Sequence, residues 1–283
     1  MGETTFIHIT DLHIGNPAVP DDHLFSDTSA TLTRVLEMIG TMDQTPRFIV
    51  ASGDLTNRGD VESYYQLKAI MAATDLPVIY ALGNHDTREG FYRGMLERST
   101  DLDAPYDHDQ VIAGVHIITL DTTTPGQIGG SLTPEQFDWL AGKLDAHPEL
   151  PKLIVAHHAP ALGDNPPWDH WRTIDFDQSQ KLAQLLKGRN ILGILSGHIH
   201  HDRFSVWHGI PVIVGMGQHA ATDILTLDVL RMVDGGSFGI GTIRSSGLTM
   251  ALVPLPQTRT ELNRYDLSAL RAKQEAALAE AAK

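Results

Sequence analysis

A chain of 283 residues with 42% hydrophobic and 20% charged residues is long enough to bury a sizeable core and has the composition of an ordinary soluble globular protein. Its formal net charge of -14 and its lack of any Lys/Arg-rich run argue against a nucleic-acid polymer as partner, because proteins that bind nucleic acids replace phosphate counterions with basic surface. The chain has no cysteine, which excludes disulfides and thiolate metal sites.

The first residues, MGETTFIHIT, show neither a basic segment nor a long apolar run, so no signal peptide is visible. No apolar run approaches the roughly 20 residues that a membrane helix needs. We therefore expect a cytoplasmic protein that makes no membrane contact.

Seven short apolar runs, most of them followed by Gly, Asn, Asp or His, predict buried strands. They lie at residues 6–10, 48–51, 78–82, 115–120, 153–156, 191–195 and 212–214. Apolar residues at helical spacing predict helices around residues 32–39, 64–71, 133–144 and 182–186. Thr133, Pro134 and Gln136 form a capping signal at the start of the third helix, and Gly188 ends the fourth. Strands that alternate with helices favour a layered α/β fold.

The remaining segments depart from this alternation. Residues 159–175 are rich in Pro, Trp and Asp and predict a loop or lid, and further β segments are expected at 238–243 and 248–253. The Ala/Glu/Lys-rich residues 266–283 predict a helix whose sparse apolar face suits surface packing or a subunit contact. We expect a main domain over residues 1–245 and a C-terminal extension over 246–283, a β segment plus a helix, which would mediate any homodimer.

Polar residues that follow the predicted strands are the chemically informative ones. In open α/β sheets, ligand sites form where the carboxyl ends of strands meet, so these residues are expected to share one crevice. They are Asp11, His13, Asp54, Asn84, His85, His157, His198, His200 and His219. Residues two apart face the same side of an extended chain, which suits Asp11 with His13 and His198 with His200. Asp and His are good ligands for divalent metals, so the set predicts a metal centre.

Each of these motifs has an ordinary explanation when it is taken alone. Asp-x-His occurs by chance, and Gly-Asp after a strand is usually a turn. Of His157 and His158, one would be a hydrogen-bonded histidine and the other would face solvent. An ordinary loop histidine is nearly as good an explanation for His219 as a phosphate contact. Gly-Asn-His-Asp at residues 83–86 is more specific, because four small or polar residues rarely end a strand without a reason. Five such motifs in this order make chance a poor explanation.

The motif series resembles the calcineurin-like metallophosphoesterase superfamily. Its five blocks are Asp11-x-His13, Gly53-Asp54, Gly83-Asn84-His85-Asp86, His157-His158 and Gly197-His198-Ile199-His200. The run Gly-Asp-Leu-Thr-Asn-Arg-Gly at residues 53–59, together with Asp86 at the end of its block, resembles class III cyclic nucleotide phosphodiesterases and bacterial glycerophosphodiesterases. The resemblance implies a metallophosphoesterase-like sandwich of two mixed β-sheets flanked by helices, with the catalytic domain over residues 1–245.

The same resemblance implies a role for each residue of the motifs. Asp11, His13 and His200 would bind a first metal ion, Asn84, His157 and His198 a second, and Asp54 would bridge both. His157 is preferred to His158 because the family ligand is the first histidine of that block. His85, oriented by Asp86, would contact a phosphate oxygen or protonate the leaving alkoxide. Asn84 and His219 would join His85 in contacting the substrate.

These roles describe a phosphodiesterase with two divalent ions, of Mn, Fe, Zn or Co, in which a hydroxide generated by the metals attacks phosphorus in line. Small substrates such as 3',5'- or 2',3'-cyclic nucleotides are expected. The alternatives are a glycerophosphodiesterase or phosphomonoesterase on the same site, a nuclease, which the acidic charge disfavours, and a non-catalytic scaffold. A scaffold would typically have lost ligands that this sequence retains.

Four loops, at residues 15–28, 87–110, 159–175 and 215–226, are expected to shape the pocket. Trp168 and Trp171 would either stack on a nucleobase or, more commonly for such residues, cover the core. Arg58 and Arg172 would either meet a phosphate or remain exposed.

Overall fold

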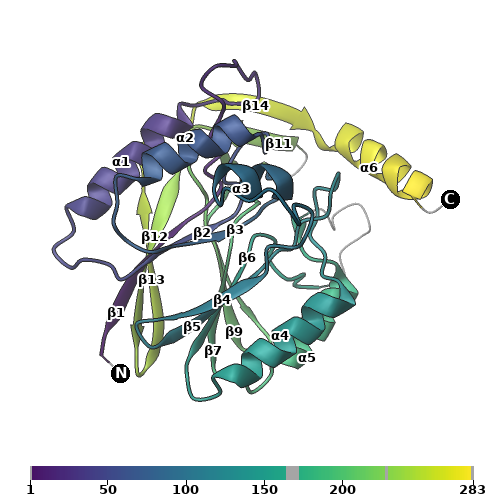
Figure 1. Ribbon diagram of the computed structural model, residues 1–283. Coiled ribbons are helices and arrows are strands. Elements are labelled where there is room, and N and C mark those ends of the chain that lie inside the picture. Colours follow the sequence, from purple (N-terminus) through teal and green to yellow (C-terminus); the bar gives the residue numbers. More distant parts are fainter. Residues whose placement is uncertain (1, 164–171, 227–228, 282–283) are drawn as a thin grey trace.

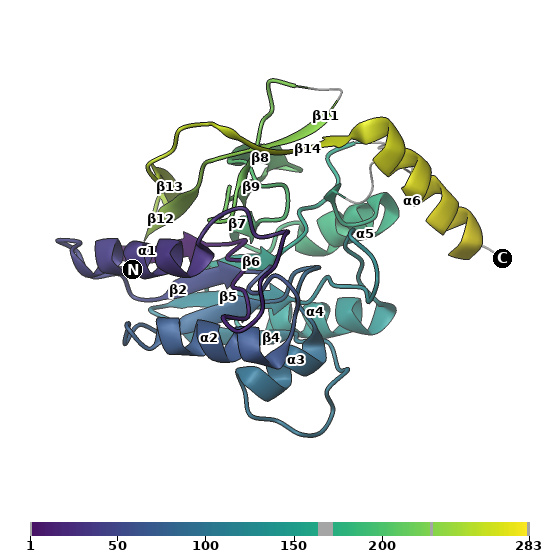
Figure 2. The same ribbon diagram turned by 90° about the horizontal axis from the view of Figure 1, so that it is seen from above.

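The computed structural model describes residues 2–163, 172–226 and 229–281 (Figure 1). Two β-sheets face each other at the centre of the molecule, and helices lie on the outer side of each. Viewed from above, the sheets lie between two groups of helices, and the C-terminal helix extends to one side (Figure 2). The expected sandwich of two mixed sheets flanked by helices is therefore confirmed.

The two main sheets are parallel at the centre and antiparallel at edges. The five-stranded sheet has the order β13 (Gly247–Pro254), β12 (Ser237–Arg244), β1 (Thr4–Ile9), β2 (Ile49–Ser52) and β3 (Val78–Ala81). The six-stranded sheet has the order β4 (His108–Ile112), β5 (Val115–Leu120), β6 (Lys152–Ala156), β7 (Ile191–Ser196), β9 (Ile210–Val214) and β8 (Arg203–Trp207). Strands β1, β2 and β3 run parallel, as do β5, β6, β7 and β9, so their carboxyl ends point the same way within each sheet.

A third, small sheet joins the C-terminal part of the chain to the segment after β9. Its order is β10 (Ala221–Thr222), β11 (Val229–Val233) and β14 (Glu261–Asp266). The helix α6 (Leu267–Ala281) follows β14 without a break, as expected for the C-terminal residues. The predicted domain boundary at residues 245 and 246 falls in the turn of the β12–β13 hairpin, whose end pair is Arg244 with Gly247.

Helices begin at side chains that cap their free backbone N–H groups. They are α1 (Thr28–Gly40), α2 (Val61–Met71), α3 (Arg88–Gly94), α4 (Pro134–Ala146) and α5 (Phe176–Leu186). Asp27, Asp60, Thr87, Thr133 and Asp175 each accept a hydrogen bond from the backbone N–H three residues on. Such a cap is worth about 1 kcal/mol. The capping box predicted at Thr133 and Gln136 is present.

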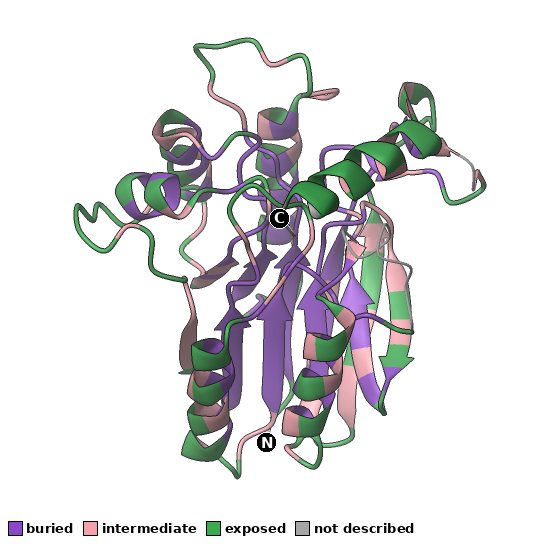
Figure 3. Cartoon of the chain, turned by 90° about the vertical axis from the view of Figure 1, so that its right-hand side faces the viewer, coloured by how far each residue is buried: buried purple, intermediate pink, exposed green. Residues whose placement is uncertain are grey.

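Three apolar clusters hold the layers together. One fills the space between the sheets, with Phe6 and Phe48 stacked at 5.1 Å against residues of β5, β6 and β7. A second joins α1 and α2 to the five-stranded sheet, and a third joins α4 and α5 to the six-stranded sheet. Figure 3 shows the central strands as buried and the outer faces of the helices as exposed. This core fixes the strand ends from which the polar loops emerge.

Elements missing from the sequence prediction lie mainly at edges. Strands β4 and β8 are the outer strands of their sheet, and half-exposed edge strands lack the continuous apolar run that marks a buried one. Strand β14 reads ELNRYD and is held by pairing with β11 and by ion pairs such as Arg231–Glu261. Within the described residues, none of the helices is both long and apolar enough to cross a membrane.

His8 gives the fold a measurable pH dependence. Its ring is buried in β1, its Nε2 lies 2.8 Å from the Ser52 hydroxyl, and burial lowers its pKa to about 4. The unfolded chain takes up a proton near pH 6.5, whereas the folded chain does so only near pH 4. His8 thus costs no stability above pH 6.5 and progressively destabilises the protein as the pH falls towards 4.

We predict that His8→Asn reduces the loss of unfolding free energy between pH 7 and pH 5 by about 2 kcal/mol relative to the unmodified protein. Urea unfolding of chelator-treated samples at both pH values measures this difference without interference from metal release. An identical pH dependence in both proteins would show that His8 does not titrate in this way.

Candidate metal centre

Loops that follow five parallel strands, β1, β2, β3, β6 and β7, bring the predicted ligands to one end of the two sheets. Asp11 lies two residues after β1, Asp54 two residues after β2, and His157 directly after β6. Backbone hydrogen bonds tie the loops to one another: Asp11 N–H donates to the Gly53 carbonyl at 3.0 Å, and His13 N–H donates to the Asp54 carbonyl at 2.9 Å. The Gly197 N–H donates to the His157 carbonyl at 3.0 Å. The expected crevice at the strand ends therefore exists.

The first group of ligand atoms comes from the loops after β1, β2 and β7. Asp11, His13, Asp54 and His200 each offer one ligand atom within 4.8 Å of the others. The Nε2 atoms of His13 and His200 are 3.3 Å apart, and His200 Nε2 lies 3.4 Å from Asp11 Oδ1. Asp11, His13 and Asp54 are fully buried, and His200 is partly exposed. This group contains the three residues predicted for the first metal and the predicted bridge.

The second group adjoins the first through Asp54. One Asp54 oxygen, Oδ2, lies 3.6 Å from His13 Nε2 and 3.3 Å from His157 Nε2. His157 and His198 belong to a second cluster whose ligand atoms also lie within 4.8 Å of one another. Asn84 contributes a buried Oδ1 that has no hydrogen-bond partner. Asp54 thus stands between two sets of ligands, where a bridging carboxylate would stand.

Three histidines of the centre are held with Nε2 turned towards the cluster. The Nδ1 atoms of His157 and His200 each lie 2.9 Å from a backbone carbonyl, that of Ser52 and that of Ala220. A carbonyl oxygen only accepts, so each Nδ1 carries a proton, and Nε2 is the nitrogen that a neutral ring would offer to a metal ion. His13 Nδ1 lies 2.9 Å from Asn57 Oδ1 in the same way. This outer arrangement is the one that orients metal-binding histidines in proteins.

Such an arrangement is unfavourable without positive charge. Facing Nε2 lone pairs of His13 and His200 repel each other, and the orphaned Asn84 Oδ1 and His157 Nε2 forgo hydrogen bonds in a buried place. Burial, helped by the neighbouring His85 and His219, lowers the pKa of His13 well below its usual value, so its ring is neutral. The oxygen and nitrogen donors therefore fit divalent cations of the transition series.

Asp54 and His157 form a buried ion pair. Burial acts to lower the pKa of His157, but the Asp54 carboxylate beside it raises that pKa to about 9. Burial acts to raise the pKa of Asp54, yet the surrounding histidines, His157 foremost, hold it well below its usual range. A cation bound here would take the place of the His157 proton.

The backbone at the centre is strained. Asp11, His13, Asp54, His198 and His200 have positive φ angles of 48°, 45°, 47°, 79° and 50°. Left-handed φ is uncommon for residues other than glycine, although Asp, Asn and His adopt it more readily than most. Strain at several ligands together is typical of functional sites, where the surrounding structure holds each residue in an unfavourable conformation.

Gly83 makes room for the Asp54 carboxylate. A Cβ atom built at Gly83 would lie 2.3 Å from Asp54 Oδ1 and 2.4 Å from the Asp54 backbone nitrogen. No real Cβ contact is that short, and the backbone nitrogen cannot move aside without moving the loop. The glycine at the start of the Gly-Asn-His-Asp motif is thus required by close approach.

His158 is buried, as is His157, so the alternative explanation in which one histidine of the pair faces solvent does not hold. Its Nδ1 lies 2.7 Å from the Thr122 hydroxyl, and its Nε2 lies 2.8 Å from the Ile128 carbonyl. Both ring nitrogens are therefore occupied, and burial lowers the pKa of His158 well below its usual value. This geometry supports His157 rather than His158 as the ligand.

Asp86 does not orient the His85 ring, which corrects the expected role of this carboxylate. The Asn57 carbonyl does so instead, at 3.0 Å from His85 Nδ1, while His85 N–H donates to Asp54 Oδ1 at 2.8 Å. Asp86 is buried and accepts hydrogen bonds from the backbone of residues 55, 56 and 83 and from the Thr56 and Tyr64 hydroxyls. Its role is to join the loops after β2 and β3.

His219 reaches the centre but is already engaged. Its ring lies 4.7 Å from that of His13, and its Nε2 accepts the Phe25 backbone N–H at 3.1 Å. Burial lowers its pKa to about 3, so the ring is neutral. Its carbonyl also accepts the Ser26 hydroxyl at 2.7 Å. His219 therefore fastens residues 15–26 to the metal centre, and a direct contact with substrate stays a prediction.

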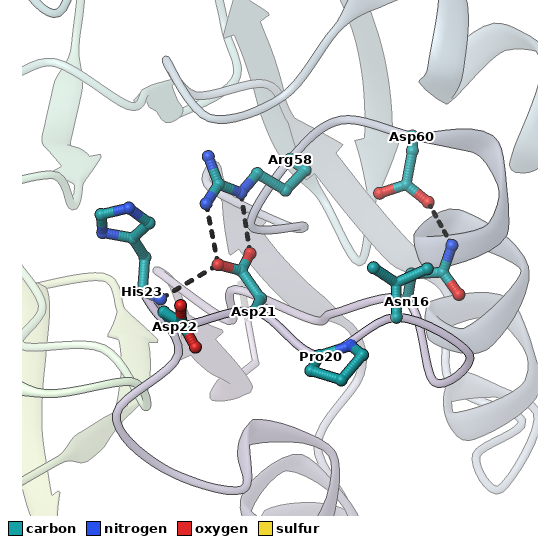
Figure 4. A pocket seen from close by; sticks show the side chains of 8 residues that line it. Asn16, Pro20, Asp21, Asp22, His23, Arg58 and Asp60 are labelled. Carbon is teal, nitrogen blue, oxygen red and sulfur yellow. Dashed lines mark hydrogen bonds and ion pairs between the residues drawn. The ribbon is translucent and has the colours of Figure 1, made fainter.

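Asn57 is a residue whose role the sequence analysis did not identify. Its Oδ1 holds His13, and its Nδ2 donates to Asp21 Oδ2 at 2.7 Å. Asp21 also accepts two hydrogen bonds from Arg58, both at 2.8 Å (Figure 4). We call residues 15–26 the Asp21 loop. The only sequence signal for Asn57 was its place in the 53–59 block, because its partners lie 44 and 36 residues away.

A cavity of about 1100 Å³ opens from the centre. Its lining includes His85 and Asn84 on one side and parts of β11, β14 and α6 on the other. Of the loops predicted to shape it, residues 15–28 and 215–226 contribute, whereas residues 87–110 do not. Residues 125–129 take part unexpectedly. In the loop 159–175 Arg172 lines the cavity, and Trp168 and Trp171 lie outside the described residues.

Known proteins resemble this chain in sequence and in fold. The sequence model of the calcineurin-like phosphoesterases matches residues 4–202. A "probable cyclic nucleotide phosphodiesterase" of Rhodococcus erythropolis is 32% identical over 214 residues, 74% of this chain and 68% of that protein. A cAMP/cGMP dual specificity phosphodiesterase of Mycobacterium tuberculosis is 31% identical over 240 residues, 82% of this chain and 71% of that protein. A dimetal phosphatase from Danio rerio shares the fold, with a TM-score of 0.65 at 14% identity over 91% of this chain and 99% of that one.

We predict that Gly83→Ala lowers the affinity for Mn²⁺ or Zn²⁺ at least tenfold, because the new methyl group displaces the Asp54 loop, and destabilises the protein by about 1–3 kcal/mol. Metal titration of chelator-treated protein and urea unfolding measure the two effects. The matched control is Gly142→Ala on the exposed side of α4, where no atom lies within 4 Å of the new Cβ. That control should bind metal normally and be slightly stabilised. Equal metal affinity in both variants would contradict the close-approach argument.

Proposed function

We propose that this chain, which belongs to the calcineurin-like phosphoesterase family and is a hydrolase of phosphate esters, acts on small phosphodiesters. Its substrates would be 3',5'- or 2',3'-cyclic nucleotides or similar compounds, cleaved at a centre of two divalent metal ions. The family and the named relatives support the class of reaction. The choice of substrate and the two-metal centre are inferences from the site and from those relatives.

The observation that carries the proposal is the place of the Asp54 carboxylate. Its Oδ2 lies 3.6 Å from the Nε2 of His13 and 3.3 Å from that of His157. One carboxylate within reach of two separate histidine groups supports two neighbouring cations rather than one. Asp11, His13 and His200 would hold the first with Asp54, and Asn84, His157 and His198 would hold the second with Asp54.

When bound, the two ions would polarise a phosphoryl oxygen and lower the pKa of water, which together make hydrolysis feasible at neutral pH. The protein's own contribution is to fix the donors in place. His13, His157 and His200 each arrive with Nδ1 tied to an oxygen, so the rings do not have to reorient when the site is filled. Preorganised donors of this kind avoid a reorganisation cost during the reaction.

His85 is the side chain best placed to transfer a proton. It follows the ligand Asn84, its side chain is exposed to the cavity, and its Nδ1 is held by the Asn57 carbonyl. The other ring nitrogen, Nε2, is thereby left for the substrate. A proton on Nε2 would pass to the oxygen of the leaving alcohol, which would otherwise depart as an unstable alkoxide.

The cavity supports a substrate larger than a simple phosphate. Its volume of about 1100 Å³ extends from Asn84 and His85 to apolar residues of the C-terminal elements, among them Tyr265 and Leu267. A diester carrying a nucleoside fits such a shape, with polar donors at one end and apolar surface at the other. Glycerophosphodiesters and phosphomonoesters would meet the same donors, so only measured rates separate these alternatives.

If the protein is a metal-dependent phosphodiesterase, its activity on a panel of diesters and monoesters can be predicted. Chelated protein should be inactive, and added Mn²⁺ should restore hydrolysis of bis-p-nitrophenyl phosphate and of cyclic nucleotides, with a kcat/KM at least tenfold above that for p-nitrophenyl phosphate or a glycerophosphodiester. Metal analysis should give two ions per chain, and Asp54→Ala should bind fewer and be inactive. A higher kcat/KM for p-nitrophenyl phosphate than for the diesters, or full activity of metal-free Asp54→Ala, would contradict the proposal.

The role of His85 predicts a dependence on the leaving group. His85→Ala should retain its metal, lose about 10²–10⁴-fold in kcat on cyclic nucleotides, and lose much less on bis-p-nitrophenyl phosphate, whose leaving group needs no proton. His208→Asn is the control, since His208 is an exposed turn histidine with a φ of 48° that Asn also tolerates. Equal losses on both substrates would indicate a binding role for His85, not proton transfer.

A further inference from the structure

Arg203 is a cavity side chain that pairs with none of the acidic residues in the described part of the chain. Arg203 opens β8, three residues after His200, so the two Cα atoms are at most about 11 Å apart. Arg203 lines the same cavity as His200 and His85. Its Nε and Nη2 atoms are almost completely shielded from solvent, and neither has a hydrogen-bond partner.

The strand pattern explains why Arg203 faces inward. Alternate residues of a strand point to opposite faces of the sheet. Trp207 is buried in the core beneath α5, and its Nε1 donates to the Ala161 carbonyl at 3.1 Å. Arg203 shares its face with Trp207, whereas Phe204 and Val206, which lie between them, are 67% and 66% exposed on the other face. The guanidinium is therefore directed towards the covered side of the sheet.

The charges around Arg203 add to its need for an anion. Arg172 lines the same cavity, and after burial its charge is the main cause that lowers the pKa of Arg203. Two other charged groups of this lining, Arg58 and Asp223, have partners of opposite charge. Arg58 is paired with Asp21 at 2.8 Å, and Asp223 is paired with Arg231 and Arg259. Although the chain has 35 acidic residues, none of those described forms an ion pair with Arg203.

A shielded guanidinium without a partner is costly, since its N–H groups have lost water and gained nothing in exchange. Its planar set of donors matches a carboxylate or a phosphate, which accepts two parallel hydrogen bonds. The cavity joins this group to the metal centre, so an anion on Arg203 and a phosphodiester at the metals would occupy one continuous space.

We propose that Arg203 forms a second anion subsite, which binds a carboxylate or phosphate that the substrate carries in addition to its scissile diester. The inference rests on the proposed phosphodiesterase function and shifts the preferred substrate from simple cyclic nucleotides, which carry no second anion, to diesters that carry one. The preferred substrate is a diester in which one esterified alcohol bears a further anionic group, and Arg203 is a specificity-determining residue.

A matched pair of diesters tests the subsite. Phenyl p-nitrophenyl phosphate and 4-carboxyphenyl p-nitrophenyl phosphate differ by one anionic group and release the same coloured product. The metal-loaded enzyme should prefer the carboxy ester by at least tenfold in kcat/KM, and Arg203→Gln should reduce this ratio to about one. The control is Arg244→Gln, which removes an exposed arginine paired with Glu3 at the far end of the five-stranded sheet and should keep the ratio.

Thermal unfolding provides a second readout that a purely structural arginine would not give. Arg203→Gln removes a shielded charge beside Arg172, so the ligand-free variant should melt a few degrees higher than the unmodified protein. In the metal-loaded enzyme, 4-carboxyphenyl phosphate should raise Tm more than phenyl phosphate does, and the variant should lose this difference. A comparison of the two ligands on the unmodified protein needs no variant, so misfolding of Arg203→Gln would not leave the subsite untested.

The outcomes separate this inference from the proposed function. If neither diester is hydrolysed in the presence of metal, the phosphodiesterase proposal fails. If both are hydrolysed with equal kcat/KM, the phosphodiesterase stands and the subsite is wrong. A preference for the carboxy ester that survives in Arg203→Gln overturns the role of Arg203. Stabilisation by benzoate or inorganic phosphate that equals that of 4-carboxyphenyl phosphate would show binding of a free anion and contradict recognition of the substrate.

Discussion

The position of one carboxylate governs the chemistry of this protein. Asp54 Oδ2 lies within 3.6 Å of His13 Nε2 and within 3.3 Å of His157 Nε2, so it is the group through which the two halves of the centre communicate. Three neighbouring features hold the Asp54 carboxylate in this position. Gly83 leaves the space, the His85 backbone N–H binds the second oxygen, and a left-handed backbone turns the side chain inward.

A second buried carboxylate maintains this arrangement from outside. Asp86 accepts five hydrogen bonds, from three backbone N–H groups and from the hydroxyls of Thr56 and Tyr64. Burial and the nearby Asp54 charge raise its pKa to about 6, so these hydrogen bonds are what keep it acceptable in the interior. Because Tyr64 lies in α2, Asp86 connects a helix, the loop after β2 and the loop after β3. The metal centre therefore depends on the packing of the whole five-stranded half.

The sequence was sufficient where the information is local. Buried strands were visible as apolar runs, and the candidate ligands were visible because Asp, Asn and His follow these strands closely. Residues whose partners are distant were not predictable in this way. The Asn57 side chain lies between His13 and Asp21, each more than 30 residues away. Asp86 was assigned to the wrong partner because adjacency in sequence suggested His85, whereas the fold brings Thr56 and Tyr64 closer. The cavity wall contributed by β14 and α6 depends on pairing of β14 with β11, and the letters ELNRYD alone do not reveal it.

The two hydrogen bonds of the Asn57 side chain link the candidate metal centre to the Asp21 loop. Its oxygen holds His13, a candidate metal ligand, and its amide nitrogen donates to Asp21. The orientation of His13 and the position of the Asp21 loop are therefore coupled through one side chain. Binding free energies that meet in a shared element are reciprocal. If the docked loop increases the free energy of cation binding, a bound cation stabilises the docked loop by the same free energy. A cation held by His13 and the docked Asp21 loop would therefore stabilise each other.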